Sequence, residues 1–194
     1  MPANYDRSAK NYDRMMAPLE WRLLARLRSE TLQLIPDGSS VLEVGCGTGA
    51  NFPFYPKTCQ AVAGEISFKM LEIARAKSKE ISIVQADAQN LPFPTDHFDA
   101  AFATLVFCTV PEPEKGLSEL RRVVKPGGRV ILLEHVRPDG LLGSIFDAIN
   151  LFTVTFFDDH FNRRTAELAE RSGLRILEVR KKAFGIINLV VCEA

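Results

Sequence analysis

The stretch Val41-Leu42-Glu43-Val44-Gly45-Cys46-Gly47-Thr48-Gly49 decides the fold of this chain. It is a short apolar run that ends in three glycines, each separated from the next by one residue. A strand that ends in such a turn can bring its backbone against a ligand, because no Cβ stands in the way. In open α/β sheets, ligands bind in the crevice where the strands end. The stretch therefore predicts a buried strand with a ligand site at its end.

Apolar runs and helical patterns alternate along the rest of the chain. The expected strands are, in order, 40–44, 59–64, 81–85, 98–106, 129–134, 174–183 and 186–192. Alternation of strands and helices is typical of a parallel sheet with helices on both faces. The short connection between the last two strands predicts a hairpin, which adds one antiparallel strand. The fold class is thus α/β, with a Rossmann-like, seven-stranded, mostly parallel sheet.

The length of 194 residues suits one domain over 1–194. Within it we expect 1–35 to form an N-terminal arm and a lid helix, and 138–160 to form an inserted helical cap over the substrate. The polar start is expected as an irregular arm or a short helix. Pro18 is expected to begin a helix that reaches about residue 35, since proline fits the first helical turn.

The composition argues against several functions. Basic and acidic residues balance at 24 each, so no positive excess exists to neutralise phosphates, and no nucleic-acid partner is expected. The four cysteines form no C-x-x-C pair, so no metal or redox motif is indicated. Residues 1–10 lack the apolar segment of a signal peptide, and no uninterrupted apolar run approaches the ~20 residues of a spanning helix. We expect a cytoplasmic protein with reduced thiols.

An acidic residue completes the candidate nucleotide site. Glu65 ends the second expected strand, 22 positions after Glu43, where an acid can accept the two ribose hydroxyls. The alternative is a tight strand–helix turn with a solvated glutamate. Dinucleotide sites use G-x-G-x-x-G, whereas here the third glycine comes one residue early and a carboxylate precedes the first. That carboxylate suits a cofactor with an ammonium group and would repel a pyrophosphate, which argues against a nicotinamide dehydrogenase.

Four segments together resemble the class I S-adenosylmethionine-dependent methyltransferases. They are E-V-G-C-G-T-G at 43–49, G-E-I-S at 64–67 with Met70, D-A-Q-N-L-P-F at 87–93 and L-R-R-V-V-K-P-G-G-R at 120–129. The resemblance covers roughly 36–136. Within that class, the chain is similar to the branch of ubiquinone/menaquinone methyltransferases, bacterial phosphatidylethanolamine N-methyltransferases and alkyl-thiol methyltransferases. Segments 103–110 and 134–136 look closest to the alkyl-thiol methyltransferases.

The resemblance implies S-adenosyl-L-methionine as cofactor and S-adenosyl-L-homocysteine as product. It assigns the methionine part to Glu43 and the glycine turn, the ribose to Glu65, and the adenine to residues after the second and third strands. It implies that Tyr5 and Tyr12 belong to an arm that closes over the cofactor. The implied cofactor-binding residues are Tyr5, Tyr12, Glu43, Gly45, Cys46, Gly47, Thr48, Gly49, Asn51, Glu65, Ile66, Met70, Asp87, Ala88, Gln89, Thr104 and Leu105.

The acceptor side has fewer signals. Methyl transfer needs alignment and exclusion of water, and a base only if the acceptor must first lose a proton. His160 and His135 are the candidates for that catalytic contact, although histidines in such positions are more often structural hydrogen-bonding groups than bases. A metal at Asp158-Asp159-His160 is not expected, since three consecutive residues rarely converge on one ion.

The apolar segment 141–157 is the best indication of the acceptor, although the same pattern is typical of core helices. Together with 18–35 it favours a small or lipid acceptor, and an alternative places both segments against a membrane surface. We therefore expect methyl transfer to a lipophilic thiol or phospholipid amine. Quinone carbon or oxygen is the alternative, and a non-catalytic module that only binds S-adenosylmethionine is the alternative of another class. The sequence does not indicate an oligomeric state.

Overall fold

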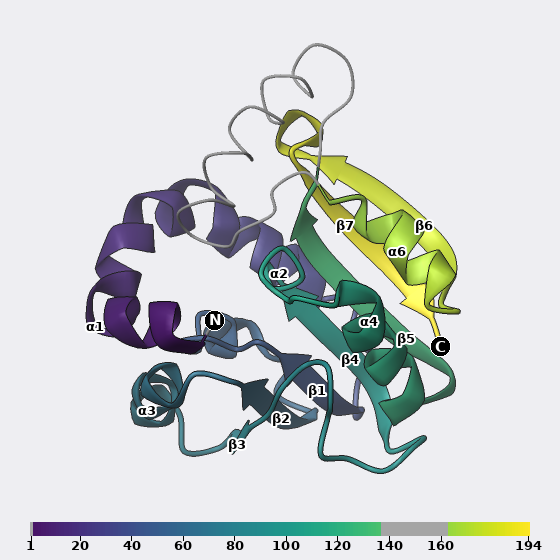
Figure 1. Cartoon of the computed structure of the whole chain (residues 1–194), viewed down its shortest axis with the longest axis horizontal. Helices are drawn as coiled ribbons and strands as arrows, with labels where there is room; N and C mark the ends of the chain where they lie inside the picture. The colour runs from purple at the N-terminus through teal and green to yellow at the C-terminus, as the bar shows by residue number, and fades with distance from the viewer. Residues whose placement is uncertain (1, 137–162) are drawn as a thin grey trace.

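The chain folds around one mixed sheet. The structure, a computed structural model, describes residues 2–136 and 163–194, without the side chains of 2–5, 7 and 8. The described strands pair in the order β3-β2-β1-β4-β5-β7-β6 (Figure 1). Their bounds are Ser40–Val44 for β1, Gln60–Glu65 for β2, Ser82–Gln85 for β3, Phe98–Thr104 for β4, Val124–His135 for β5, Arg175–Lys182 for β6 and Ile187–Glu193 for β7.

Among the described strands, β7 alone points in the direction opposite to the others. It pairs antiparallel with both β5 and β6, whereas β1, β2, β3, β4 and β5 pair in parallel. The predicted sheet, with one antiparallel strand from a C-terminal hairpin, is confirmed. The parallel strands all end at the same edge, which is the edge that the glycine turn follows.

Helices cover both faces of the sheet, as predicted. Their bounds are Pro2–Leu19 for α1, Ala25–Leu32 for α2, Phe68–Lys77 for α3, Pro113–Val123 for α4 and Thr165–Arg171 for α6. Buried side chains of α2 pack with Val41, Phe102 and Ile131 on one face. Those of α4 and α6 pack with Leu42 and Ala101 on the other. Figure 1 shows α4 and α6 in front of the sheet, and α1 against α3.

The N-terminal segment differs from the prediction. Helical structure continues from Pro2 to Leu32 through a π-helical turn, η1, at Glu20–Leu24. The prediction that Pro18 begins the helix is wrong, because Pro18 lies inside α1 just before η1. Proline lacks an N–H and its ring crowds the carbonyl of the preceding turn, so the α-helical hydrogen-bond pattern is interrupted there. The π-helical turn that follows accommodates the interruption without ending the helix.

Strand β5 begins earlier than predicted. The segment Lys125-Pro126-Gly127-Gly128 is typical of a turn, yet it lies within β5, which pairs Val124 with Phe98. The register between β4 and β5 shifts after Phe98, so a bulge absorbs the turn residues. The rest of the strand then pairs as expected and brings its end to the same edge as β1 and β4.

The short helix after the glycine turn is confirmed. It is the single 3-10 turn η2 at Phe52–Phe54, with proline inside it. A second 3-10 turn, η3 at Ala183–Gly185, joins β6 and β7. The predicted insertion at 138–160 and its apolar segment 141–157 lie outside the described residues. Among the helices that the structure does describe, none has the length and apolarity needed to span a bilayer.

Candidate cofactor site

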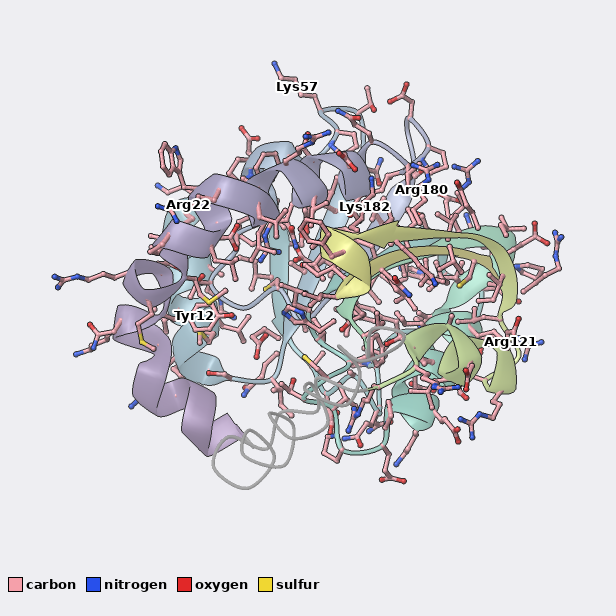
Figure 2. The ribbon with its side chains drawn as sticks, turned by 90° about the horizontal axis from the view of Figure 1, so that it is seen from above. Tyr12, Arg22, Lys57, Arg121, Arg180 and Lys182 are labelled. Carbon is pink, nitrogen blue, oxygen red and sulfur yellow. The ribbon has the colours of Figure 1, made fainter. Side chains whose placement is uncertain are left out.

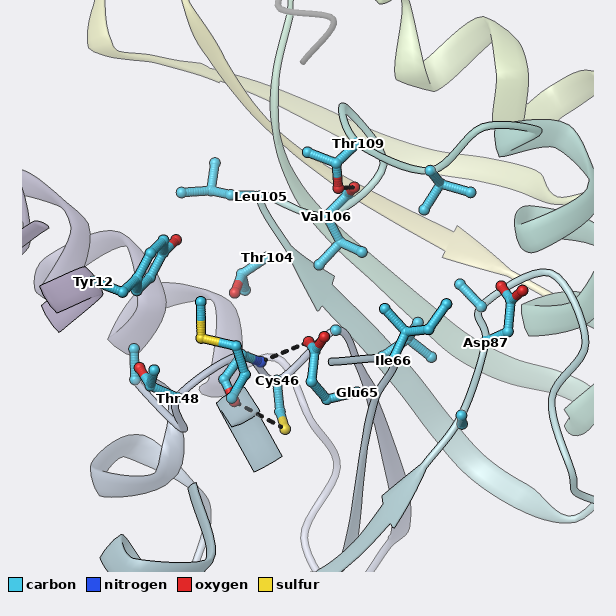
Figure 3. A pocket seen from close by; sticks show the side chains of 18 of the residues that line it. Tyr12, Cys46, Thr48, Glu65, Ile66, Asp87, Thr104, Leu105, Val106 and Thr109 are labelled. Carbon is cyan, nitrogen blue, oxygen red and sulfur yellow. Dashed lines mark hydrogen bonds between the residues drawn. The ribbon is translucent and has the colours of Figure 1, made fainter. Parts of the chain in front are cut away.

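A cavity of about 370 Å³ lies at the ends of β1, β2 and β4. Its size is in the range of small-molecule sites in proteins. The lining residues are Tyr12, Arg28, Val44, Gly45, Cys46, Gly47, Thr48, Ala50, Glu65, Ile66, Met70, Ala86, Asp87, Ala88, Gln89, Thr104, Leu105, Val106, Thr109, Val110 and Pro111. Figure 3 shows side chains from α1, the glycine turn and the strand ends arranged around the same space.

The glycine turn is built for close approach. Gly45, Gly47 and Gly49 all have positive φ, at 70°, 55° and 82°, a region that favours glycine. A Cβ at Gly45 would meet Val106 at 2.5 Å, so this glycine lets two segments of the site touch. A Cβ at Gly47 would meet no protein atom within 4 Å. Gly47 thus lines the cavity, and the position that a Cβ would take is open.

Glu65 links the turn to the next helix. Its Oε2 accepts a hydrogen bond from the backbone N–H of Gly47 at 3.0 Å, and its Oε1 accepts one from that of Ser67 at 2.8 Å. Burial raises the pKa of Glu65, although these hydrogen bonds oppose the shift. Each carboxylate oxygen can accept a further hydrogen bond. Glu65 is thus fixed at the cavity wall with acceptor capacity left for ligand hydroxyls.

Helix α1 forms one wall and is tied to the turn by polar contacts. Tyr12 lines the cavity, and its neighbour Asp13 accepts a hydrogen bond from the Thr48 hydroxyl at 2.5 Å. The other oxygen of Asp13 pairs with Lys77 of α3 at 2.6 Å. Two turns earlier, Asp6 accepts from the Ser67 hydroxyl at 2.5 Å. The predicted arm is therefore helical in this structure and closed against the site.

A buried arginine lies on the floor of the cavity. Arg28, which is 6% exposed, donates from Nη1 to Thr104 Oγ1 at 2.6 Å and to Asn51 Oδ1 at 3.0 Å. Its Nη2 pairs with Glu20 of η1 at 2.7 Å. Because Glu20 and Arg28 belong to the N-terminal helices, this network joins those helices to the ends of β1 and β4.

Glu43 lies beneath this floor. Its carboxylate accepts hydrogen bonds from Asn51 Nδ2, at 2.6 Å, and from the Tyr55 hydroxyl. Glu43 is 1% exposed, and burial raises its pKa to about 7, against the opposing effect of the two hydrogen bonds and the nearby Arg28. The carboxyl is therefore buried at the base of the glycine turn and is held in place by donors of the protein itself.

The other end of the cavity is a tightly held loop after β4. Leu105 has a φ of 59°, which is uncommon for a bulky residue and is typical of strained functional segments. Glu134 Oε1 accepts from the N–H groups of Val106 and Phe107 at 3.0 and 3.1 Å. Arg163 donates from Nη1 to the carbonyls of Phe107 and Val110, the latter at 2.6 Å. A carboxylate and a guanidinium thus hold this apolar loop from two sides.

The structure brings most of the predicted cofactor residues together. Those that line the cavity are Tyr12, Gly45, Cys46, Gly47, Thr48, Glu65, Ile66, Met70, Asp87, Ala88, Gln89, Thr104 and Leu105. Glu43 and Asn51 are not among the lining residues and lie in the buried network below. Gly49 packs against Phe52. The side chain of Tyr5 lies outside the description.

The candidate acceptor-side histidines remain predictions. His135 is half-buried at the end of β5 and is not among the residues that line the cavity. Burial lowers the pKa of His135 to about 4, so the imidazole is neutral at pH 7 and weakly basic. His160, with its neighbours Asp158 and Asp159, lies outside the described residues. Within 2–136 and 163–194, no group of three or more His, Cys, Asp or Glu side chains forms a metal site.

Arg28 is the principal residue that sequence reasoning missed. It sits in a stretch with three other arginines, so its composition gives no signal. Its spacing of eight from Glu20 is the only local indication, because two helical turns bring such positions to the same side of a helix. The apolar residues Val106, Val110 and Pro111 of the cavity wall were also outside the predicted set.

Comparison with known families identifies a methyltransferase domain in this chain. Residues 42–132 match the family model described as a methyltransferase domain. This part of the chain is therefore a methyltransferase domain, and the predicted resemblance to S-adenosylmethionine-dependent methyltransferases is confirmed.

Curated relatives agree with this assignment. Phosphatidylethanolamine N-methyltransferase of Cereibacter sphaeroides is 37% identical over 125 residues, which are 61% of this chain and 62% of that protein. Demethylmenaquinone methyltransferase of Bacillus licheniformis is 34% identical over 145 residues, which are 70% of this chain and 62% of the relative. The chain thus spans less than two thirds of the length of either relative.

The arrangement of the fold is also found in a solved structure. A methyltransferase of Thermotoga maritima superposes with a TM-score of 0.78 and 21% sequence identity. The match covers 100% of this chain and 99% of that one. At this identity the likeness shows the shared fold alone.

Proposed function

We propose that this chain binds S-adenosylmethionine in the cavity described above and transfers its methyl group to a small lipophilic acceptor. The observation that carries the proposal is the two-ended character of the cavity. One end has the open glycine turn, Glu65 and Asp87, and the other has the apolar loop that begins at Leu105. A polar end for a nucleoside beside an apolar end for the acceptor is the arrangement that such a reaction requires.

The residues present fit S-adenosylmethionine. Gly47 leaves the space that a Cβ would fill, which allows backbone contact with the cofactor. The carboxylates of Glu65 and Asp87 follow β2 and β3, where they can accept from ribose hydroxyls and from the adenine amino group. Ile66 and Met70 supply apolar surface between these two acids for the adenine ring. Arg28 places a guanidinium on the cavity floor, beside Thr104.

When bound, S-adenosylmethionine supplies an electrophilic methyl group on a sulfonium. The role of the protein is to align the acceptor atom with that methyl group and to exclude water. Tyr12 on α1 and Leu105 after β4 cover the cavity from two sides (Figure 3). Thr104, held by Arg28 and Asn51, fixes the end of β4 at the junction between the polar and apolar ends.

The proposed acceptor is lipophilic, with thiols and phospholipid amines ahead of quinones. Apolar side chains of Leu105, Val106, Val110 and Pro111 support this class. The names of the two curated relatives support it as well, because phosphatidylethanolamine and demethylmenaquinone are both lipids. A protonated amine or a thiol must lose a proton before it accepts a methyl group. His135 and His160 remain our proposed residues for accepting that proton.

The first experiment is a calorimetric titration of the purified chain with S-adenosylmethionine and S-adenosylhomocysteine. Micromolar binding of both supports the cofactor assignment, and absence of binding overturns it. Release of S-adenosylhomocysteine is then measured with three acceptors: phosphatidylethanolamine vesicles, a demethylmenaquinone and an alkanethiol. Turnover with one of them identifies the acceptor atom. Binding without any turnover would favour the non-catalytic module.

We also propose a domain organisation and a location for this chain. We propose that residues 1–194 act as a single cytoplasmic domain in which 138–160 cap the substrate. Contact with a membrane surface through 18–35 and 141–157 is the related proposal for how a lipid acceptor is reached. Of these two segments, the structure describes 18–35.

A further inference from the structure

The N-terminal helices carry an exposed apolar face. Met15, Leu19 and Trp21 are 70%, 41% and 84% exposed, and Pro18 between them is exposed too. Met15 and Leu19 are four residues apart, and Pro18 and Trp21 are three residues apart, so each pair spans about one helical turn. These residues therefore occupy two adjacent stripes on one side of α1 and η1. Large apolar residues gathered on an exposed surface mark an interaction site.

Basic side chains frame this face. Arg14 lies at its N-terminal end and Arg22 at its C-terminal end, and both are exposed. Arg26, further along, is exposed too but pairs with Glu30 at 3.0 Å. The acids of the same stretch are engaged elsewhere, because Asp13 pairs with Lys77 and Glu20 pairs with Arg28. The outer face consequently presents apolar residues between positive charges. We call Arg14, Met15, Pro18, Leu19, Trp21 and Arg22 the outer patch.

The same helices also contribute side chains to the cavity. Tyr12 lines the cavity from α1, and Arg28 reaches its floor from α2. Figure 2 shows Arg22 on the outer side of this helical segment and Tyr12 on the side that faces the rest of the molecule. Leu24, Leu27 and Leu32 are buried against the sheet. The buried residues of the predicted 18–35 segment thus begin at Leu24, and the exposed apolar surface lies just before them, at 15–21.

We propose that the outer patch docks on an anionic lipid bilayer. An interfacial helix presents apolar residues to the acyl boundary and cations to lipid phosphates, which is the pattern of the outer patch. Tryptophan prefers the headgroup level of a bilayer, because its ring is apolar and its N–H is polar. The proposal deepens the proposed function and rests on it for the lipophilic acceptor, since docking places the cofactor cavity next to a lipid surface.

Trp21 is itself the probe, because it is the only tryptophan in the chain. The full-length protein is titrated with vesicles of phosphatidylcholine alone and of phosphatidylcholine with phosphatidylglycerol, and tryptophan emission is recorded. We expect a blue shift with the anionic vesicles, reversed when salt is raised, because added ions screen the attraction. Quenching by brominated acyl chains should accompany the shift. No shift with anionic vesicles, or an equal shift with neutral ones, would overturn the proposal.

Paired variants separate the charge from the apolar surface. Arg14→Gln with Arg22→Gln should lower the partition coefficient about 30-fold at low salt, from about fivefold per arginine. The control pair Arg121→Gln with Arg171→Gln removes the same charge from α4 and α6, on the other face of the sheet, and should have little effect. An equal loss in both pairs would show that net charge alone attracts the protein to vesicles, and the outer patch would have no special role.

Met15→Ser with Leu19→Ser tests the apolar part and keeps Trp21 as reporter. We expect at least about a tenfold loss of partitioning, since about 100 Å² of apolar surface no longer enters the bilayer. Leu177→Ser with Val179→Ser on β6 is the matched control, because these residues are 44% and 40% exposed. Far-UV circular dichroism of each variant confirms that α1 is still folded.

Two further outcomes are informative. A concentration-dependent dimer in sedimentation that protects Trp21 from a soluble quencher would assign the outer patch to a second copy of the chain and overturn the lipid proposal. Each sample is also titrated with S-adenosylhomocysteine. Loss of vesicle binding with intact S-adenosylhomocysteine binding sinks only the docking inference. The reverse result sinks the cofactor assignment and leaves docking in place.

Discussion

The buried carboxyl of Glu43 should make the stability of this protein depend on pH in a way that one substitution removes. Burial raises the pKa of Glu43 from its usual 4.5 to about 7. Glu43→Gln replaces the titrating group by an amide of the same size, whose oxygen can still accept from Asn51. The difference in unfolding free energy between the wild type and this variant therefore isolates the titration of one residue.

The sign and size follow from proton linkage. Between about pH 5 and about pH 8 the unfolded carboxyl is deprotonated while the folded one still holds its proton up to its raised pKa, so the native state binds more protons. The stability that this carboxyl contributes is complete below the unfolded pKa and is lost as the pH rises through the folded pKa. With pKa values of 4.5 and about 7, integration over this window gives a loss of about 2.5 kcal/mol.

Urea unfolding of both proteins across this pH range measures the effect. Because the m-value scales with the surface exposed, equal m-values for the two proteins allow their midpoints to be compared directly. We expect the wild type to lose about 2.5 kcal/mol relative to Glu43→Gln as the pH rises. Glu72→Gln on the exposed side of α3 serves as the control for the removal of a surface carboxyl. A difference between the wild type and Glu43→Gln that stays constant with pH, within about 0.5 kcal/mol, would refute a raised pKa at this position.

Three further predictions test the walls of the site. Glu65→Ala should weaken S-adenosylhomocysteine binding about 10- to 100-fold, because charged hydrogen bonds contribute about 1.5–3 kcal/mol. Calorimetry measures the affinity, and circular dichroism should show that the helices are retained. Unchanged affinity would contradict the assignment of Glu65 to the ribose. Gly47→Ala should cost about 1–2 kcal/mol in urea unfolding because of its φ of 55°. It should also weaken binding if the cofactor occupies the open space beside this lining residue, and unaltered affinity would mean that no ligand approaches there. Glu134→Leu should cost about 3 kcal/mol in the same assay, because two buried N–H groups lose their acceptor, and Glu134→Gln should restore part of it; equal loss in both would show that shape rather than hydrogen bonding matters.

The strands were predictable because their signal is local. The apolar runs around Val41 and Ile131 can only be buried strands in a chain with this alternation, and their ends follow from adjacent glycines and polar residues. Errors arose where one residue type suits two structures. Pro18 fits a first helical turn as well as an interrupted helix, and Gly127-Gly128 fits a turn as well as a bulged strand. Only pairing with distant segments decides between these alternatives.

The site was predictable where it follows the strands. The turn at Gly45 and the acid Glu65 are fixed by their place after β1 and β2, so topology alone brings them together. Arg28 was not predictable by the same means, because Asn51 and Thr104 are 23 and 76 residues away. Which side of an amphipathic helix faces a cavity is set by tertiary packing, and the pattern of its sequence does not report it.

The N-terminal helices contribute both to the cavity and to the exposed apolar surface. Their inner side provides Tyr12 and Arg28 to the cavity, and their outer side provides Trp21 to the surface. The interruption at Pro18 and η1 lies between these groups, so the two halves of the segment meet where the helical ladder is weakest. Contacts of α1 with the glycine turn are polar and few, and those of α2 with the sheet are apolar and buried. The wall of the cavity is therefore joined to the glycine turn through polar contacts of α1, and its floor is joined to the sheet through the buried residues of α2.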